Sequence, residues 1–112
     1  MTAPVPAGDP FDALSDPRRR QILSLLADAD RSVQQIAAEM PISRPAVSRH
    51  LRLLREAGLV AERPVGARRI YQLQAEGALA VDRYLHEVWG DVAARFRLFA
   101  ENTAPDDRDG PA

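Results

Sequence analysis

The chain has 112 residues, of which 46% are hydrophobic and 28% are charged, and it contains no cysteine. This composition is ordinary for one globular domain with a limited core, and the lack of cysteine excludes disulfides, thiolate metal sites and thiol redox chemistry. The first residues carry neither a basic stretch nor a long apolar run, so we expect no signal peptide, no membrane contact and a cytoplasmic location.

The net charge of −1 conceals an uneven distribution of charge along the chain. Residues 17–73 hold eleven arginines against five acids, a local balance of +6, whereas the remaining residues hold four arginines against eleven acids, a balance of −7. Because the local charge decides whether a surface attracts phosphate, the slightly acidic total does not exclude a nucleic-acid-binding surface.

The two ends of the chain differ in composition from its middle. Residues 1–8 are rich in Pro, Ala and Gly, and residues 102–112 combine acids with Pro and Gly. Such segments have too little apolar surface to fold, so we expect both ends to be disordered. The folded domain is predicted to span residues 9–101.

The first predicted elements are two helices that begin in the same way. Asp9 and Asp16 are suitable N-cap residues, and each precedes a proline that fits the first helical position. We expect a short helix at 10–14 and a longer one at 17–27. Apolar residues at i, i+3 and i+4 support the longer helix: Ile22, Leu25 and Leu26.

Two further helices follow, with serine at each predicted N-cap. Ser32 precedes a helix at 33–40, and Ser43 precedes a helix at 44–57 that Gly58 ends as a C′ residue. The first of these helices is predicted to bury Val33, Ile36, Ala37 and Met40, and the second to bury Val47, Leu51 and Leu54.

The apolar period then changes from that of a helix to that of a strand. Residues 59–65 and 68–73 are rich in β-formers and flank a Gly-Ala turn, which predicts a short hairpin. A last helix is expected at 78–100. Its apolar residues fall at helical spacing: Val81, Leu85, Val88, Trp89, Val92, Phe96 and Phe99. The fold class is therefore mainly α with a small β-hairpin, in the order α-α-α-α-β-β-α.

The helix at 44–57 keeps a polar and cationic face after its core residues are assigned. The residues on that face are Ser43, Arg44, Ala46, Ser48, Arg49, His50 and Arg52. Such groups on a helix sized for the major groove are typical of base and phosphate contacts, and Arg44 and Arg49 have the geometry for guanine O6 and N7. An ordinary solvated helix face is the alternative for this pattern taken alone.

The hairpin favours the DNA-binding interpretation. Arg63, Arg68 and Arg69 flank its glycine turn directly after the helix pair, as in a wing whose arginines reach phosphates or a minor groove. The helix at 17–27 begins with three further arginines, Arg18, Arg19 and Arg20. These side chains fit a position near the DNA backbone, and they fit a solvated position or a dimer salt bridge equally well.

Three segments carry a resemblance to a known family. They are DALSDPRRRQIL at 12–23, ISRPAVSRHLRLLREAGLV at 42–60 and GARRIYQL at 66–73. Together they resemble the ArsR-type family of winged helix-turn-helix repressors, over about residues 9–100. The resemblance implies a homodimer formed by the first and last helices, and an operator near the protein's own promoter, where binding blocks transcription.

The resemblance also implies which residues contact double-stranded DNA. The family's recognition helix maps onto residues 43–57, and its base-reading positions become Ser43, Arg44, Pro45, Ala46, Ser48, Arg49 and His50. Arg52 and Arg55 are expected to contact phosphates, together with the wing residues Arg63, Arg68 and Arg69.

The last helix has a wider apolar face than a small core can cover, and such a face usually marks an interface. The predicted dimer contacts are Phe11, Leu14, Leu85, Val88, Trp89, Val92, Phe96 and Phe99. A twofold dimer places its recognition helices about one DNA turn apart, roughly 34 Å, so the operator is expected to be an inverted repeat.

The resemblance suggests metal sensing as a function, but the sequence gives it little support. One family site uses two cysteines at the stretch 33–37, where this chain has none. Another uses Asp, His and Glu on the last helix, where Asp82 and His86 share a face, but zinc requires three or four ligands. We therefore expect no metal and no cofactor; a metal-responsive repressor using Asp82 and His86 remains an alternative.

Two other functional classes were weighed against a DNA-binding regulator. No nucleophile–base pair and no phosphate-binding glycine loop is recognisable, so an enzyme is not expected. A winged-helix protein–protein adaptor is the second alternative, and the arginines of the helix and hairpin argue against it. The sequence does not identify a small-molecule effector.

Overall fold

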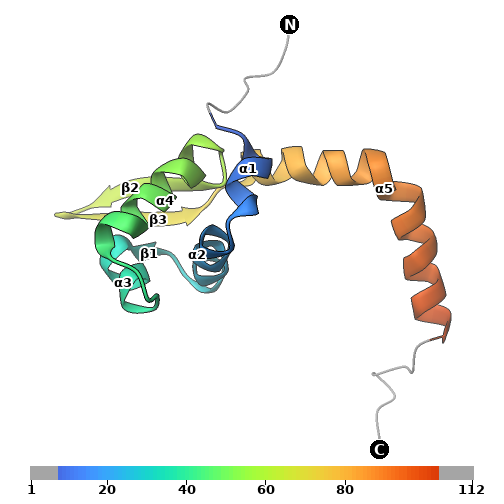
Figure 1. Ribbon diagram of the computed structural model, residues 1–112, viewed down its shortest axis with the longest axis horizontal. Coiled ribbons are helices and arrows are strands. Elements are labelled where there is room, and N and C mark those ends of the chain that lie inside the picture. Colours follow the sequence, from blue (N-terminus) through green and yellow to red (C-terminus); the bar gives the residue numbers. More distant parts are fainter. Residues whose placement is uncertain (1–7, 104–112) are drawn as a thin grey trace, which may run out of the picture. The chain divides into compact units, whose positions relative to one another are not determined.

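The computed structural model describes residues 8–103, apart from five side chains on the last helix (Figure 1). The predicted disordered tails therefore lie almost entirely outside the described residues. The chain forms two compact units, Met1–Val81 and Asp82–Ala112, and the last helix contributes to both. None of the helices within residues 8–103 is both long and apolar enough to cross a membrane.

The structure contains every helix and strand that the sequence predicts, and one short strand more. The elements in chain order are α1 (Pro10–Ser15), α2 (Pro17–Asp28), β1 (Arg31–Ser32), α3 (Val33–Ala38), α4 (Arg44–Glu56), β2 (Val60–Val65), β3 (Arg68–Leu73) and α5 (Ala75–Thr103).

All four predicted N-caps are confirmed. The side chains of Asp9, Asp16, Ser32 and Ser43 each accept a hydrogen bond from a backbone N–H in the first turn that follows. Ser32 also forms a full capping box with Gln35, whose side-chain oxygen accepts from the Ser32 N–H at 2.8 Å. These caps satisfy N–H groups that a helix leaves without partners, which fixes where each helix begins.

Helix ends differ from the predictions by a few residues. Helix α3 ends at Ala38 rather than at residue 40, because Pro41 follows closely and disfavours helical geometry in the residue before it. Helix α4 ends at Glu56, one residue before the predicted end, and Gly58 adopts φ +73°, the left-handed conformation expected of a C′ glycine. Helix α5 begins three residues earlier than predicted, at Ala75, and continues to Thr103.

The hairpin belongs to a three-stranded antiparallel sheet in the order β1-β3-β2. Strand β1 places Arg31 opposite Tyr71 and Ser32 opposite Ile70. Two residues are too few to produce an alternating pattern, which is why the sequence did not predict this strand. The β2–β3 hairpin, called the wing below, turns at Gly66 with φ +62°.

The core of the first unit lies where α2, α3 and α4 pack against the sheet. Its largest fully buried side chains are Ile22, Ile36, Val47, Leu51, Leu54 and Val60. The predicted apolar stripe of α4 is thus confirmed. Val33 and Ala37, which were predicted to be buried, are only partly so, and they pack at the edge of this core.

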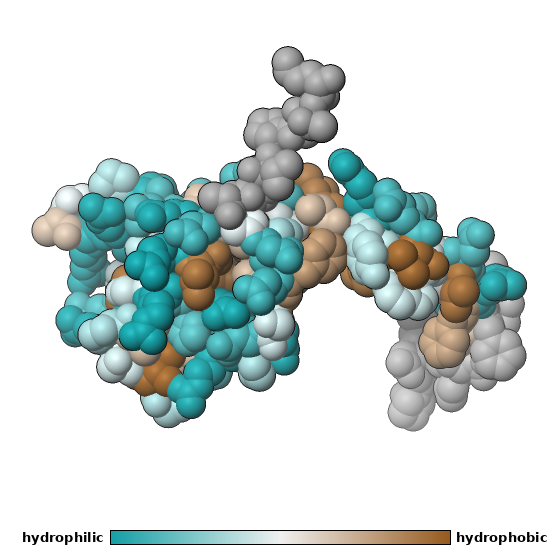
Figure 2. Space-filling model, turned by 45° about the horizontal axis from the view of Figure 1, so that its top comes forward, coloured by the Kyte–Doolittle hydropathy of each residue, from teal (hydrophilic) through white to brown (hydrophobic). Residues whose placement is uncertain are grey.

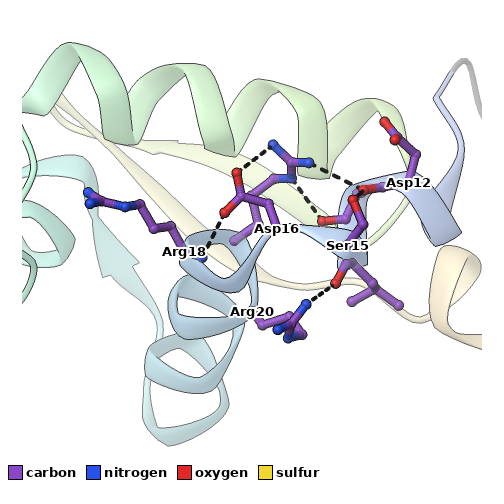
Figure 3. Close-up of polar contacts among 8 residues, drawn as sticks. Asp12, Ser15, Asp16, Arg18 and Arg20 are labelled. Carbon is purple, nitrogen blue, oxygen red and sulfur yellow. Dashed lines mark hydrogen bonds and ion pairs between the residues drawn. The ribbon is translucent and has the colours of Figure 1, made fainter.

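A second set of contacts joins α1 to α2 through arginine side chains (Figure 3). The buried Arg19 donates from Nε to the Ala13 carbonyl at 2.8 Å and from Nη2 to the Asp12 carbonyl at 3.2 Å. Arg20 Nη1 donates to the Leu14 carbonyl at 2.6 Å. These bonds satisfy carbonyls at the end of α1. Arg19 therefore has an internal role, which differs from both the position near the DNA backbone and the solvated position considered for it.

The second unit exposes large hydrophobic side chains along α5, some of them visible as brown areas in Figure 2. They are Tyr84, Leu85, Val88, Trp89, Val92 and Phe96, and their exposed fractions range from 44% to 71%. The rings of Tyr84 and Trp89 meet edge to face, with centroids 5.9 Å apart. The side chain of Phe99 lies outside the described residues.

Candidate nucleic-acid interface

The N-terminal half of α4 and the wing line one open groove. Arg44, Pro45 and Ser48 of α4 line it together with Arg68 and Arg69 of β3, and its volume is about 550 Å³. Ser32, Val33, Gln34, Ala67 and Tyr71 complete the lining. Residues that sequence reasoning assigned to two separate elements are thereby brought to a single polar surface.

Most of the predicted DNA-contact residues are exposed on the first unit. The exposed ones are Ser43, Arg44, Pro45, Ser48, Arg49, Arg52, Arg55, Arg63, Arg68 and Arg69. Within residues 8–103, the guanidinium groups of Arg44, Arg49, Arg52 and Arg68 form no ion pair. Their N–H donors are therefore available to phosphate oxygens or to base edges.

Of the predicted base-reading residues, only Arg44, Pro45 and Ser48 line this groove. Ser43 and Arg49 are exposed outside it. With 3.6 residues per turn, Ala46 and His50 fall on the flank of α4 opposite Ser48, and both are only half exposed. The Nδ1 atom of His50 is buried and has no hydrogen-bond partner among the described residues. His50 instead lies in the electrostatic field of Asp16 and Arg19, at the start of α2.

The environment of His50 keeps its imidazole uncharged at neutral pH. Burial is the main cause that lowers its pKa below the usual 6.5, and the positive charges of Arg19, Arg49 and Arg18 lower the pKa further. The negative charge of Asp16 opposes them. His50 therefore adds no positive charge to the interface at pH 7.

Three of the predicted phosphate contacts have acidic partners that sequence reasoning missed. Arg55 and Arg69 both form ion pairs with Glu62, and Arg63 pairs with Asp30, with 3.5 Å between Nη2 and Oδ2. Glu62 lies seven residues from both Arg55 and Arg69. That spacing predicts an ion pair only once the strand register and the packing of α4 are known.

Glu62 is ionised within this cluster. A hydrogen bond from the Tyr71 hydroxyl is the main cause that lowers the pKa of Glu62, and the charges of Arg55 and Arg69 lower it further, whereas partial burial raises it. Burial is the main cause that raises the pKa of Tyr71, and the same hydrogen bond raises it further. A carboxylate with three donors directed at it is a stable anion at neutral pH.

The candidate metal residues of the last helix lie together but in an unfavourable setting. Asp82 and His86 line a groove of about 230 Å³ on α5 that Arg97 also lines. A guanidinium in the same groove repels a cation. Within residues 8–103, no group of three or more His, Cys, Asp and Glu side chains is arranged to hold a metal ion.

Comparison with known proteins agrees with the geometry. Residues 16–62 match the family of bacterial regulatory proteins described as the arsR family. The HTH-type transcriptional regulator Rv2034 of Mycobacterium tuberculosis is 44% identical over 79 residues, which are 70% of this chain and 74% of that protein. The transcriptional repressor SdpR of Bacillus subtilis is 40% identical over 63 residues, 56% of this chain and 70% of that one.

A solved structure shows the same fold. A crystal structure described as a possible transcriptional regulator for arsenical resistance superposes with a TM-score of 0.68 at 36% identity, covering 82% of this chain and 96% of the other. These proteins are transcriptional regulators and not enzymes, and the fold is the winged helix-turn-helix. This chain therefore belongs to the ArsR family of DNA-binding transcriptional regulators.

Proposed function

We propose that the protein is a repressor that binds an inverted-repeat operator as a homodimer, with α4 in the major groove and the wing beside it. The observation that carries the proposal is the groove shared by Arg44 and Ser48 of α4 and by Arg68 and Arg69 of the wing. A recognition helix reads bases only if neighbouring elements hold it against the duplex, and the wing arginines supply that contact.

The exposed residues of α4 have distinct roles in this proposal. Arg44 and Arg49 reach guanine O6 and N7, and Ser43 and Ser48 donate hydrogen bonds to bases or phosphates. Arg52 contacts the backbone, as do the wing arginines. Pro45 offers an apolar contact to a thymine methyl group. His50 is assigned no base contact, because it is partly buried and lies in the electrostatic field of the start of α2.

The dimer is proposed from the second unit. Six large hydrophobic side chains are exposed along α5 between residues 84 and 96, and a second copy of the same helix covers them best, because a twofold axis pairs one apolar face with another. The predicted interface also includes Phe11, which is 43% exposed, and Leu14 of α1. Repression is proposed because SdpR, a relative, is named as a repressor.

The test is a titration of the protein onto its own upstream DNA, followed by fluorescence anisotropy. We expect log K to fall with log salt by about 0.9 for each phosphate contacted. The double variant Arg44→Ala/Arg49→Ala should weaken operator binding at least about 30-fold, since two bidentate base contacts are lost. The control Arg83→Ala/Arg95→Ala removes the same charge from α5 and should bind almost normally, provided that its dimer mass is unchanged.

Added zinc and EDTA separate the proposal from the metal-responsive alternative. We expect operator affinity to be the same in both. Release of DNA by zinc would make Asp82 and His86 part of a metal site. If the protein selects no duplex from a random-sequence library at low salt, DNA recognition through this surface is wrong and the adaptor alternative gains support.

A further inference from the structure

Glu62 lies where the recognition helix meets the wing. It stands directly opposite Tyr71 in the β2–β3 register, and Arg69 precedes Tyr71 by two residues. The three side chains therefore share one face of the sheet. Arg55, in the last turn of α4, reaches the same carboxylate. Side chains from three elements thus meet at one anion.

Both guanidinium groups donate to the same oxygen atom of Glu62. Arg69 Nη1 lies 3.0 Å from Oε1, and Arg55 Nη1 pairs with that same atom. The Glu62 side chain is 19% exposed, whereas those of Arg55 and Arg69 are 44% and 70% exposed. A guanidinium carries five N–H donors, so each arginine keeps donors that Glu62 does not use.

We propose that Glu62 is a positioning residue for DNA binding, whose carboxylate holds Arg55 and Arg69 as a pair that presents its remaining donors to the phosphate backbone. This inference rests on the proposed function, because it requires α4 and the wing to contact one duplex. An arginine that is already fixed loses less side-chain freedom when it binds a phosphate. The fixed pair also sets the angle between helix and wing, and hence the register on the DNA.

A competing effect acts in the opposite direction. Any acid beside DNA-contacting arginines weakens their attraction to a polyanion, and Glu62 reduces the charge of its cluster from +2 to +1. If this were its only effect, removing the charge would strengthen binding to every sequence. If Glu62 positions the two arginines, its removal weakens binding to the operator relative to other sequences.

Asp30 supplies a matched control for the charge. Among the described residues it pairs only with Arg63, which points to the opposite face of the wing from Glu62. Its side chain is 45% exposed, and the pair links the wing to the loop before β1 rather than to α4. Asp30→Asn and Glu62→Gln each remove one negative charge beside a wing arginine, but only Glu62→Gln disconnects α4 from the wing.

The experiment measures the affinity of wild type, Glu62→Gln and Asp30→Asn for two duplexes over a salt series. The first duplex is the tightest one that the wild type selects from a random library, and the second has the same length and a shuffled sequence. We expect Glu62→Gln to lower the ratio of the two affinities by about threefold to tenfold, the range for partly exposed charge-assisted contacts. Asp30→Asn should raise both affinities and leave their ratio unchanged.

A tighter operator complex with an unchanged ratio in Glu62→Gln would overturn the positioning role, as would behaviour identical to wild type. A variant that was merely unstable would lose affinity for both duplexes equally, and urea unfolding checks this directly. Tyr71→Phe removes a donor to the same carboxylate and should lower the ratio by less. Failure of the wild type itself to bind in a salt-sensitive way would instead refute the proposed function.

Discussion

The two units of this protein use hydrophobic residues in opposite ways. In the first unit, Ile22, Val47, Leu51 and Leu54 are fully buried by other residues of the same unit. In the second unit, residues of the same chemical kind, such as Val88 and Phe96, are about half exposed or more on a single helix. The core of the first unit therefore contains its own partners, whereas the apolar face of α5 in the second unit is uncovered. We propose that a second copy covers that face.

The sharpest way to test this contrast is to make the apolar face of α5 charged. Trp89→Glu/Phe96→Glu should convert the dimer to a monomer, because unpaired carboxylates are costly to bury. Operator affinity should fall by about 100-fold or more, since a monomer contacts one half-site. Sedimentation and anisotropy measure the two effects. The control Trp89→Phe/Phe96→Leu stays apolar and should remain dimeric; a dimeric Glu variant would refute this interface.

A smaller effect is expected from the Arg19 hydrogen bonds that join α2 to α1 in the first unit. Arg19→Met removes the donors to the Ala13 and Asp12 carbonyls, and losing charge-assisted bonds of this kind should reduce the free energy of unfolding by about 1–3 kcal/mol. The exposed Arg18 forms no side-chain hydrogen bond within residues 8–103, so Arg18→Met should change stability by less than about 0.5 kcal/mol. If Arg19→Met and Arg18→Met changed the free energy of unfolding in urea equally, the Arg19 hydrogen bonds would contribute nothing to stability.

The smallest effect concerns pH. The pKa of Asp16 is lowered from its usual 3.8, mainly by the backbone N–H of Arg18, and further by the charge of Arg19. A carboxylate whose pKa is lowered by folding stabilises the protein above its usual pKa, and this contribution is lost as the pH falls through the folded value. Asp16→Asn keeps a cap but not the charge, so the wild type should be slightly more stable at pH 7.

The stability curves of Asp16→Asn and wild type should converge as the pH falls below about 3.8. Chemical denaturation of both proteins over a pH series measures the difference, and contributions from other carboxylates such as Glu62 cancel in it. A difference that does not change with pH would mean that the charge of Asp16 contributes nothing and that only its cap matters.

The features that were predictable from the sequence are those that neighbouring residues determine. Helix starts are predictable because a cap acts on N–H groups two or three residues away. The four N-caps are Asp9, Asp16, Ser32 and Ser43. The apolar periods of α4 and of the wing likewise predicted a helix and two strands. The winged helix-turn-helix fold followed from these local signals and from the family resemblance.

The features that were missed depend on contacts between elements. Glu62 gains its two arginines only through strand register and helix packing, and β1 forms only because β3 offers it an edge. His50 was predicted to read bases from its place on the helix. The packing of α2 against α4 is what leaves its side chain partly buried. Residue type shows what a side chain can bind, whereas the partner it finds is a property of the assembled fold.

The position of Trp89 gives the protein a built-in optical reporter. It is the only tryptophan in the sequence, and it lies on the apolar face of α5, in contact with Tyr84 and 47% exposed. Its emission wavelength is therefore set by whatever covers that helix, and not by the core of the first unit. Emission followed against dilution reports assembly, while circular dichroism follows the fold, so the two processes can be separated in one unlabelled sample.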